Sequence, residues 1–140
     1  MRVLWELDHT LRRASKSMES RLGVTGPQRL VIRLVGRFPD VTAGDLAALM
    51  HIDPSSLTGV LHRLERAGFL TRRSDRADRR RALFSLTAKG RALDQVRSGT
   101  AEAAVVRALK SQPSDRIQEA RTLLIALARA LSALPPVPHD

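Results

Sequence analysis

Arginine is concentrated in one short stretch of the sequence. Six of the ten residues from Arg72 to Arg81 are arginine, and Asp75 and Asp78 are the acidic residues among them. Guanidinium groups bind phosphates and guanine edges in a bidentate manner, and they favour the negative potential of a DNA minor groove. The stretch therefore predicts binding to a polyanion. The alternative is a solvated run of surface charge.

The preceding segment carries polar residues at helical spacing. Asp53 and Pro54 predict a helix start, and Leu57, Leu61 and Leu64 predict its buried face. The outward face carries Ser55, Ser56, Thr58, Gly59, His62 and Arg63. Small side chains allow a helix backbone to approach the bases in a groove about 12 Å wide. We therefore expect the Ser and Thr hydroxyls to meet phosphates or base edges, and His62 and Arg63 to reach deeper or to the backbone. Arg63 is the best candidate for a guanine contact.

A shorter helix is predicted before this one, from Thr42 to about His51. Two helices joined by a turn of about four residues have the outline of a helix-turn-helix, although an ordinary αα-corner has the same spacing. After the second helix, two short strands at 70–73 and 81–86 flank a polar turn. A helix-turn-helix followed by a basic β-hairpin predicts a winged helix-turn-helix.

Each arginine of the hairpin has an expected role. Arg72, Arg73 and Arg81, beside the strands, are expected to meet phosphates, whereas Arg76 and Arg79 are expected to enter a minor groove. Asp78 is interpreted as a brace for a nearby arginine, Arg80, across the turn. All of these arginines, including Arg80, are predicted DNA-binding residues.

Composition limits the class of protein. The chain has 140 residues and a net charge of +10, which favours nucleic acid or anionic lipid as a partner. It has no cysteine, and His9, His51, His62 and His139 lack the spacing of metal ligands, so we expect no metal and no cofactor. No phosphate loop, HExxH motif or nucleophile elbow is present, so an enzyme is not expected. No signal peptide and no membrane span are recognisable, so we expect a cytoplasmic protein without a membrane partner.

Both ends of the chain carry apolar stripes that predict helices. At the N-terminal end the stripe includes Leu4, Leu7 and Leu11, which suit either a core helix or a dimer contact. At the C-terminal end, heptad spacing links Ile117, Leu124, Leu127 and Leu131. Because both ends show this periodicity, we expect a helical dimer lobe built from them.

The expected organisation is a single, mainly α domain of residues 1–140 with six helices and a two-stranded wing. It combines a winged helix-turn-helix lobe at 25–90 with a dimerisation lobe at 1–24 and 91–134, and a flexible tail at 135–140. One helix is expected from Thr87 to about Leu109, with Gly99 as a bend.

The sequence from Arg63 to Gly90, RLERAGFLTRRSDRADRRRALFSLTAKG, resembles the MarR family of bacterial transcription regulators. It contains the Asp-Arg-Arg of the family's wing at Asp78–Arg80, followed by Leu-Thr-x-x-Gly at 86–90. Two departures stand out. The loop has Arg76-Ala77 where Pro-Glu or similar is usual, and Gly59 occupies a position where a larger polar residue is common.

The resemblance implies an obligate homodimer that binds a pseudo-palindromic double-stranded DNA operator. Many relatives repress neighbouring genes and release DNA when a small aromatic or phenolic ligand binds. Candidate ligand-lining residues are Trp5, His9, Arg33 and Arg37, with Trp5 in the dimer seam and a solvated His9 as the alternative. The rival function is a winged-helix module for nucleic acid or protein scaffolding without a ligand response.

Overall fold

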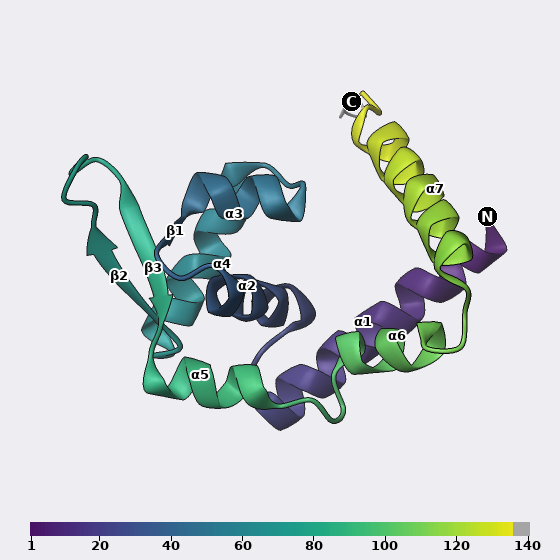
Figure 1. Cartoon of the computed structure of the whole chain (residues 1–140), viewed down its shortest axis with the longest axis horizontal. Helices are drawn as coiled ribbons and strands as arrows, with labels where there is room; N and C mark the ends of the chain where they lie inside the picture. The colour runs from purple at the N-terminus through teal and green to yellow at the C-terminus, as the bar shows by residue number, and fades with distance from the viewer. Residues whose placement is uncertain (136–140) are drawn as a thin grey trace, which may run out of the picture. The chain divides into compact units, whose positions relative to one another are not determined.

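The computed structural model describes residues 1–135 (Figure 1). They divide into two compact units, and the boundary in the sequence lies between Ala101 and Glu102. The first unit contains α1 (Arg2–Leu22), α2 (Gly26–Arg37), β1 (Val41–Thr42), α3 (Ala43–Met50), α4 (Pro54–Arg66), β2 (Leu70–Ser74), β3 (Ala82–Leu86) and α5 (Ala88–Gln95). The remaining helices are α6 (Ala101–Leu109), which starts at the boundary, and α7 (Ser114–Ser132). The mainly α fold with a β wing is confirmed. The lobe boundaries at 25–90 and 91–134 stay a prediction. The expected tail, residues 135–140, lies outside the described residues except for Pro135.

The core of the first unit lies between α2, α3, α4 and the sheet. Its fully buried side chains include Val31 and Ile32 of α2, Leu46 of α3, and Leu57 and Leu64 of α4. Burying each such side chain stabilises the fold by about 1.5–3 kcal/mol. The apolar spacing of the sequence therefore fixes which face of α4 is available to a partner.

The helix starts follow local capping chemistry. Thr25 and Gln28 form a capping box at α2, and the Asp53 carboxylate accepts the Ser55 amide at the start of α4. The start of α4 agrees with the sequence prediction.

The sheet has one more strand than expected. Its order is β1-β3-β2, all antiparallel, and Val41 of β1 pairs with Phe84 of β3. A two-residue strand is too short to show alternation, so no pattern in the sequence indicated it. In the hairpin, Leu70 pairs with Leu86 and Ser74 with Ala82, which agrees closely with the expected strands.

The prediction of one helix from Thr87 to Leu109 was wrong, so the described residues contain seven helices instead of six. The helix stops at Gln95 and resumes at Ala101, with Gly99 in the left-handed region at φ 70°. Arg29 of α2, only 1% exposed, donates hydrogen bonds to the main-chain oxygens of Leu93 and Val96. A buried guanidinium thus binds carbonyls at the C-terminal end of α5, where partners within the helix run out.

The turn between α4 and β2 packs tightly against the start of α5. Thr87 caps α5 by accepting the Gly90 amide, and its hydroxyl donates to the carbonyl of Gly68 at 2.6 Å. A Cβ on Gly90 would lie 2.1 Å from the Phe69 carbonyl oxygen. Lys89 donates to the Ala67 carbonyl and lies 4.4 Å from the centre of the Phe69 ring. These contacts explain the threonine and the glycine of the Leu-Thr-x-x-Gly sequence and fix the base of the wing.

The second unit has little interior of its own. No residue of α6 or α7 is buried, and Leu124, Leu127 and Leu131 of α7 are 44–61% exposed. Ile117 is half-buried. Leu7 and Leu11 of α1, in the first unit, are similarly exposed, and Leu4 is half-buried. The residues expected at a dimer interface are therefore largely uncovered in one protomer. Within the described residues, no helix combines the length and apolarity needed to cross a membrane.

Candidate nucleic-acid interface

Helix α4 presents the predicted polar face to solvent. Ser55, Ser56, Thr58, His62 and Arg63 are all exposed, whereas Leu57, Leu61 and Leu64 are buried. The Ser55 hydroxyl donates to Asp53 at 2.7 Å, and the Thr58 hydroxyl donates to the Pro54 carbonyl at 3.2 Å. Because both hydroxyl protons are engaged, these two oxygens are left as acceptors, which suits base amino groups better than phosphates.

Asp53 at the start of α4 is held ionised. The hydrogen bonds from the Ser55 hydroxyl and amide lower the pKa of the Asp53 carboxyl below its usual value. A carboxylate at a helix N-terminus is favoured by the helix dipole. It also repels phosphate, so the N-terminus of α4 is not itself an anion site.

The wing turn is held by two aspartates through main-chain hydrogen bonds. Asp78 accepts the amide of Arg80 at 3.0 Å, and Asp75 accepts the amide of Ala77 at 2.9 Å. Asp78 thus braces the main chain of Arg80, and the hydrogen bond leaves the Arg80 guanidinium available to bind DNA. Arg76 and Arg79 lie exposed in the same turn.

The hairpin forms a basic hollow of about 360 Å³. Its lining residues are Arg72, Arg73, Ser74, Arg79, Arg80, Arg81 and Ala82. Five of the six wing arginines therefore converge on one surface, and Arg76 lies in the turn beyond it. Such a surface attracts phosphates.

Asp40 holds the wing in position, which the sequence did not reveal. It lies in the turn after α2, at φ 62°, and forms two contacts with Arg73 of β2, at 2.8 and 3.2 Å. The Ser85 hydroxyl of β3 donates to the same carboxylate at 2.6 Å. Asp40 therefore ties both wing strands to the end of α2. Arg73, which was expected to meet phosphate, uses its guanidinium within the protein, and Arg81 lies 4.0 Å from Asp45.

The Asp40 clamp predicts a change in acid stability. The bond from Arg73, and then that from Ser85, lowers the pKa of the Asp40 carboxyl. A lowered carboxyl pKa adds stability above its unfolded value of about 4, and this stability is lost as the pH falls through the folded value. Asp40→Asn should therefore flatten the fall in Tm between about pH 5 and pH 2. Arg73→Gln should have the same effect, and parallel curves for wild type and both variants would contradict the clamp.

The four candidate ligand residues do not form one cluster in a protomer. Trp5 is 69% exposed and His9 is exposed on α1, whose first turns lie apart from α2 in Figure 1. On α2, Arg33 forms an ion pair with Asp94 at 2.6 Å, and the Arg37 guanidinium lies 5.8 Å from the centre of the Phe38 ring. Their role in ligand binding stays a prediction.

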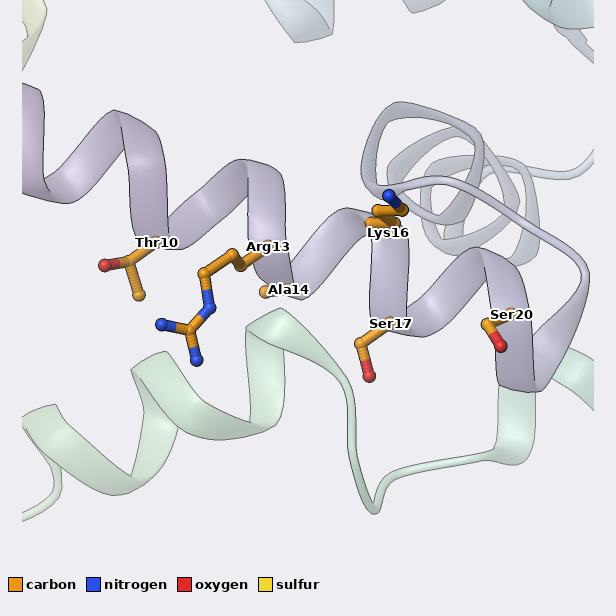
Figure 2. A pocket seen from close by; sticks show the side chains of 6 residues that line it. All are labelled: Thr10, Arg13, Ala14, Lys16, Ser17 and Ser20. Atoms are coloured by element: carbon orange, nitrogen blue, oxygen red, sulfur yellow. The ribbon is translucent and has the colours of Figure 1, made fainter.

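A separate hollow of about 550 Å³ lies along α1. It is lined by Thr10, Arg13, Ala14, Lys16, Ser17 and Ser20. Figure 2 shows Arg13 and Ser17 pointing to the same side of the helix. None of the four candidate ligand residues lines this hollow.

Comparisons with known proteins agree with this geometry. The family model described as MarR family matches residues 22–81. An HTH-type transcriptional repressor of Mycobacterium tuberculosis is 28% identical over 122 residues, which cover 87% of this chain and 88% of that protein.

Two solved structures share the fold. The MepR–DNA complex of S. aureus has a TM-score of 0.75 at 16% identity, covering 92% of this chain and 95% of that one. PcaV of Streptomyces coelicolor, solved with its natural ligand, has a TM-score of 0.73 at 24% identity, covering 93% and 89%.

A helix-turn-helix with an exposed polar second helix, next to an arginine-rich hairpin, defines a winged helix-turn-helix protein. The family model spans this lobe from the end of α1 to the end of the wing turn. Over this lobe the chain matches the MarR family, and the relative that it resembles over most of its length is a transcriptional repressor.

Proposed function

We propose that the chain is a homodimeric, sequence-specific repressor that acts in the cytoplasm and is released from double-stranded DNA by a small aromatic or phenolic ligand. The observation that carries the proposal is the exposed polar face of α4 beside the arginine hollow of the wing. In this arrangement α4 enters a major groove and Arg76 and Arg79 meet the adjacent minor groove. The repressor named among the relatives supports the direction of regulation.

Dimerisation is supported by the uncovered apolar residues at both ends of the chain. A helix that buries no side chain is marginal in water, because its stability in proteins comes mostly from packing. Leu124, Leu127 and Leu131 lie on one stripe of α7, and all three are exposed. Leu7 and Leu11 on α1 offer a second apolar surface. A second copy of the chain can bury both.

Two copies of the wing predict both the footprint and the salt dependence. A dimer should protect two half-sites about one helical turn apart. If each protomer neutralises roughly three to five phosphates, the plot of log affinity against log salt should have a slope of about −6 to −9. Footprinting and titrations in about 50–300 mM salt measure both quantities. A single protected half-site, with a monomer in sedimentation, would refute the dimer.

Ligand release is supported by the relative that was solved with a natural ligand. A ligand can act only if it binds more tightly to the arrangement that does not fit DNA. Titrating phenol and benzoate derivatives into the protein–DNA complex tests this directly. The engagement of Arg33 by Asp94 favours a second candidate, a DNA-binding regulator that responds to no ligand. No loss of DNA binding with any of these compounds would support that candidate.

A further inference from the structure

Gly59 lies in the middle of α4, on its exposed face, where the fold gives it no packing role. It is the sixth residue of a helix that runs from Pro54 to Arg66. Glycine destabilises a helix interior relative to alanine because it loses more conformational freedom on folding. A glycine at such a position therefore calls for a reason outside helix formation.

Other glycines in the helices show what a packing reason looks like. A Cβ on Gly36 would lie 2.9 Å from an Asp94 oxygen, and one on Gly90 would lie 2.1 Å from the Phe69 oxygen. At Gly59 the nearest atom to such a Cβ is Nη2 of Arg63, at 3.9 Å, which is ordinary van der Waals contact. The protein itself therefore has room for a methyl group at position 59.

The residues around Gly59 lie on the exposed face of α4. Helical spacing places Ser55 and Ser56 on one side of it, and His62 and Arg63 on the other, along the same exposed face. The Arg63 side chain runs back along the helix so that its guanidinium lies beside the Gly59 position. Gly59 is thus a position without a side chain at the centre of the polar face, with a guanidinium beside it.

We propose that Gly59 is the point of closest approach between α4 and the base edges, and that it determines specificity by setting the depth at which Arg63 reads guanine. This inference rests on the DNA-binding role of α4. A methyl group at position 59 would meet the DNA, not the protein, and would hold the helix away from the groove. Phosphate contacts made by the flexible wing arginines tolerate such a shift better than a bidentate base contact does.

The test is Gly59→Ala, with Gly44→Ala as a matched control. Gly44 is also exposed on a helix and has room for a Cβ, but it lies on α3. The probe is the duplex that the wild-type protein selects from a random pool, with a scrambled duplex of the same composition as reference. Gly59→Ala should raise Tm by about 2–5 °C. It should also weaken binding to the selected duplex by about tenfold or more while leaving the scrambled duplex nearly unchanged.

The possible results distinguish a failure of the proposed function from a failure of the inference about Gly59. If the wild type selects no sequence, the proposed sequence-specific function fails and the inference fails with it. If the wild type selects a sequence and Gly59→Ala binds it equally well, only the inference fails. A lower Tm for Gly59→Ala would show that the glycine serves folding, and an equal affinity loss for Gly44→Ala would show that position 59 is not special. Either result overturns the proposal.

Discussion

Arg63→Ala is expected to weaken binding to the selected operator by about 30-fold or more, because a bidentate guanine contact is worth about 1–3 kcal/mol and a dimer loses two of them. Arg63 is exposed on α4, and its guanidinium lies at the centre of the polar face. Since it projects away from Leu57, Leu61 and Leu64, the substitution leaves the core intact. Competition titrations with operator and scrambled duplexes measure the affinity and the sequence preference together.

Arg79→Ala is the matched comparison, because Arg79 lies in the wing and lines the basic hollow. Its loss should weaken binding to operator and scrambled duplex alike and should make the salt slope less steep, by about 1 for each phosphate that is no longer neutralised. Arg63→Ala should instead reduce the preference between the two duplexes. Equal losses on both duplexes for both variants would refute this division between the helix and the wing.

Gly90→Ala is expected to destabilise the fold by more than about 3 kcal/mol, because overpacking against rigid backbone has no low-energy relief. The added Cβ would lie 2.1 Å from the Phe69 carbonyl oxygen, and that carbonyl belongs to the turn between α4 and β2. To accept the methyl, α5 must move away from the wing and lose the Thr87 and Lys89 bonds to that turn. Urea denaturation monitored by circular dichroism measures the loss.

The control for this variant is Gly44→Ala, where the nearest atom to a Cβ is the Thr42 hydroxyl oxygen at 3.8 Å. That change should leave stability equal or slightly higher. If Gly90→Ala unfolds at the same urea concentration as wild type, α5 does not lie this close to the α4–β2 turn.

The sequence predicted the features that depend on neighbouring residues. Asp53 with Pro54 indicated the start of α4, and the segments on either side of the polar turn were predicted as strands to within a residue of their bounds. It missed the features that depend on distant partners. The clamp joins Asp40 and Arg73 across 33 residues, and Arg29 reaches the end of α5 across 64. An aspartate after a helix and an arginine inside one carry no local sign of such partners, so the break between α5 and α6 also went unrecognised.

In the proposed dimer, the exposed apolar surfaces of α6 and α7 affect how much intact protein accumulates in the cell. A folded state that is completed by a second copy becomes more stable as the concentration of chains rises. At low copy number more chains are unpaired, and their leucine-rich helices are open to proteases. The population of intact regulator should then fall more steeply than the rate of its synthesis.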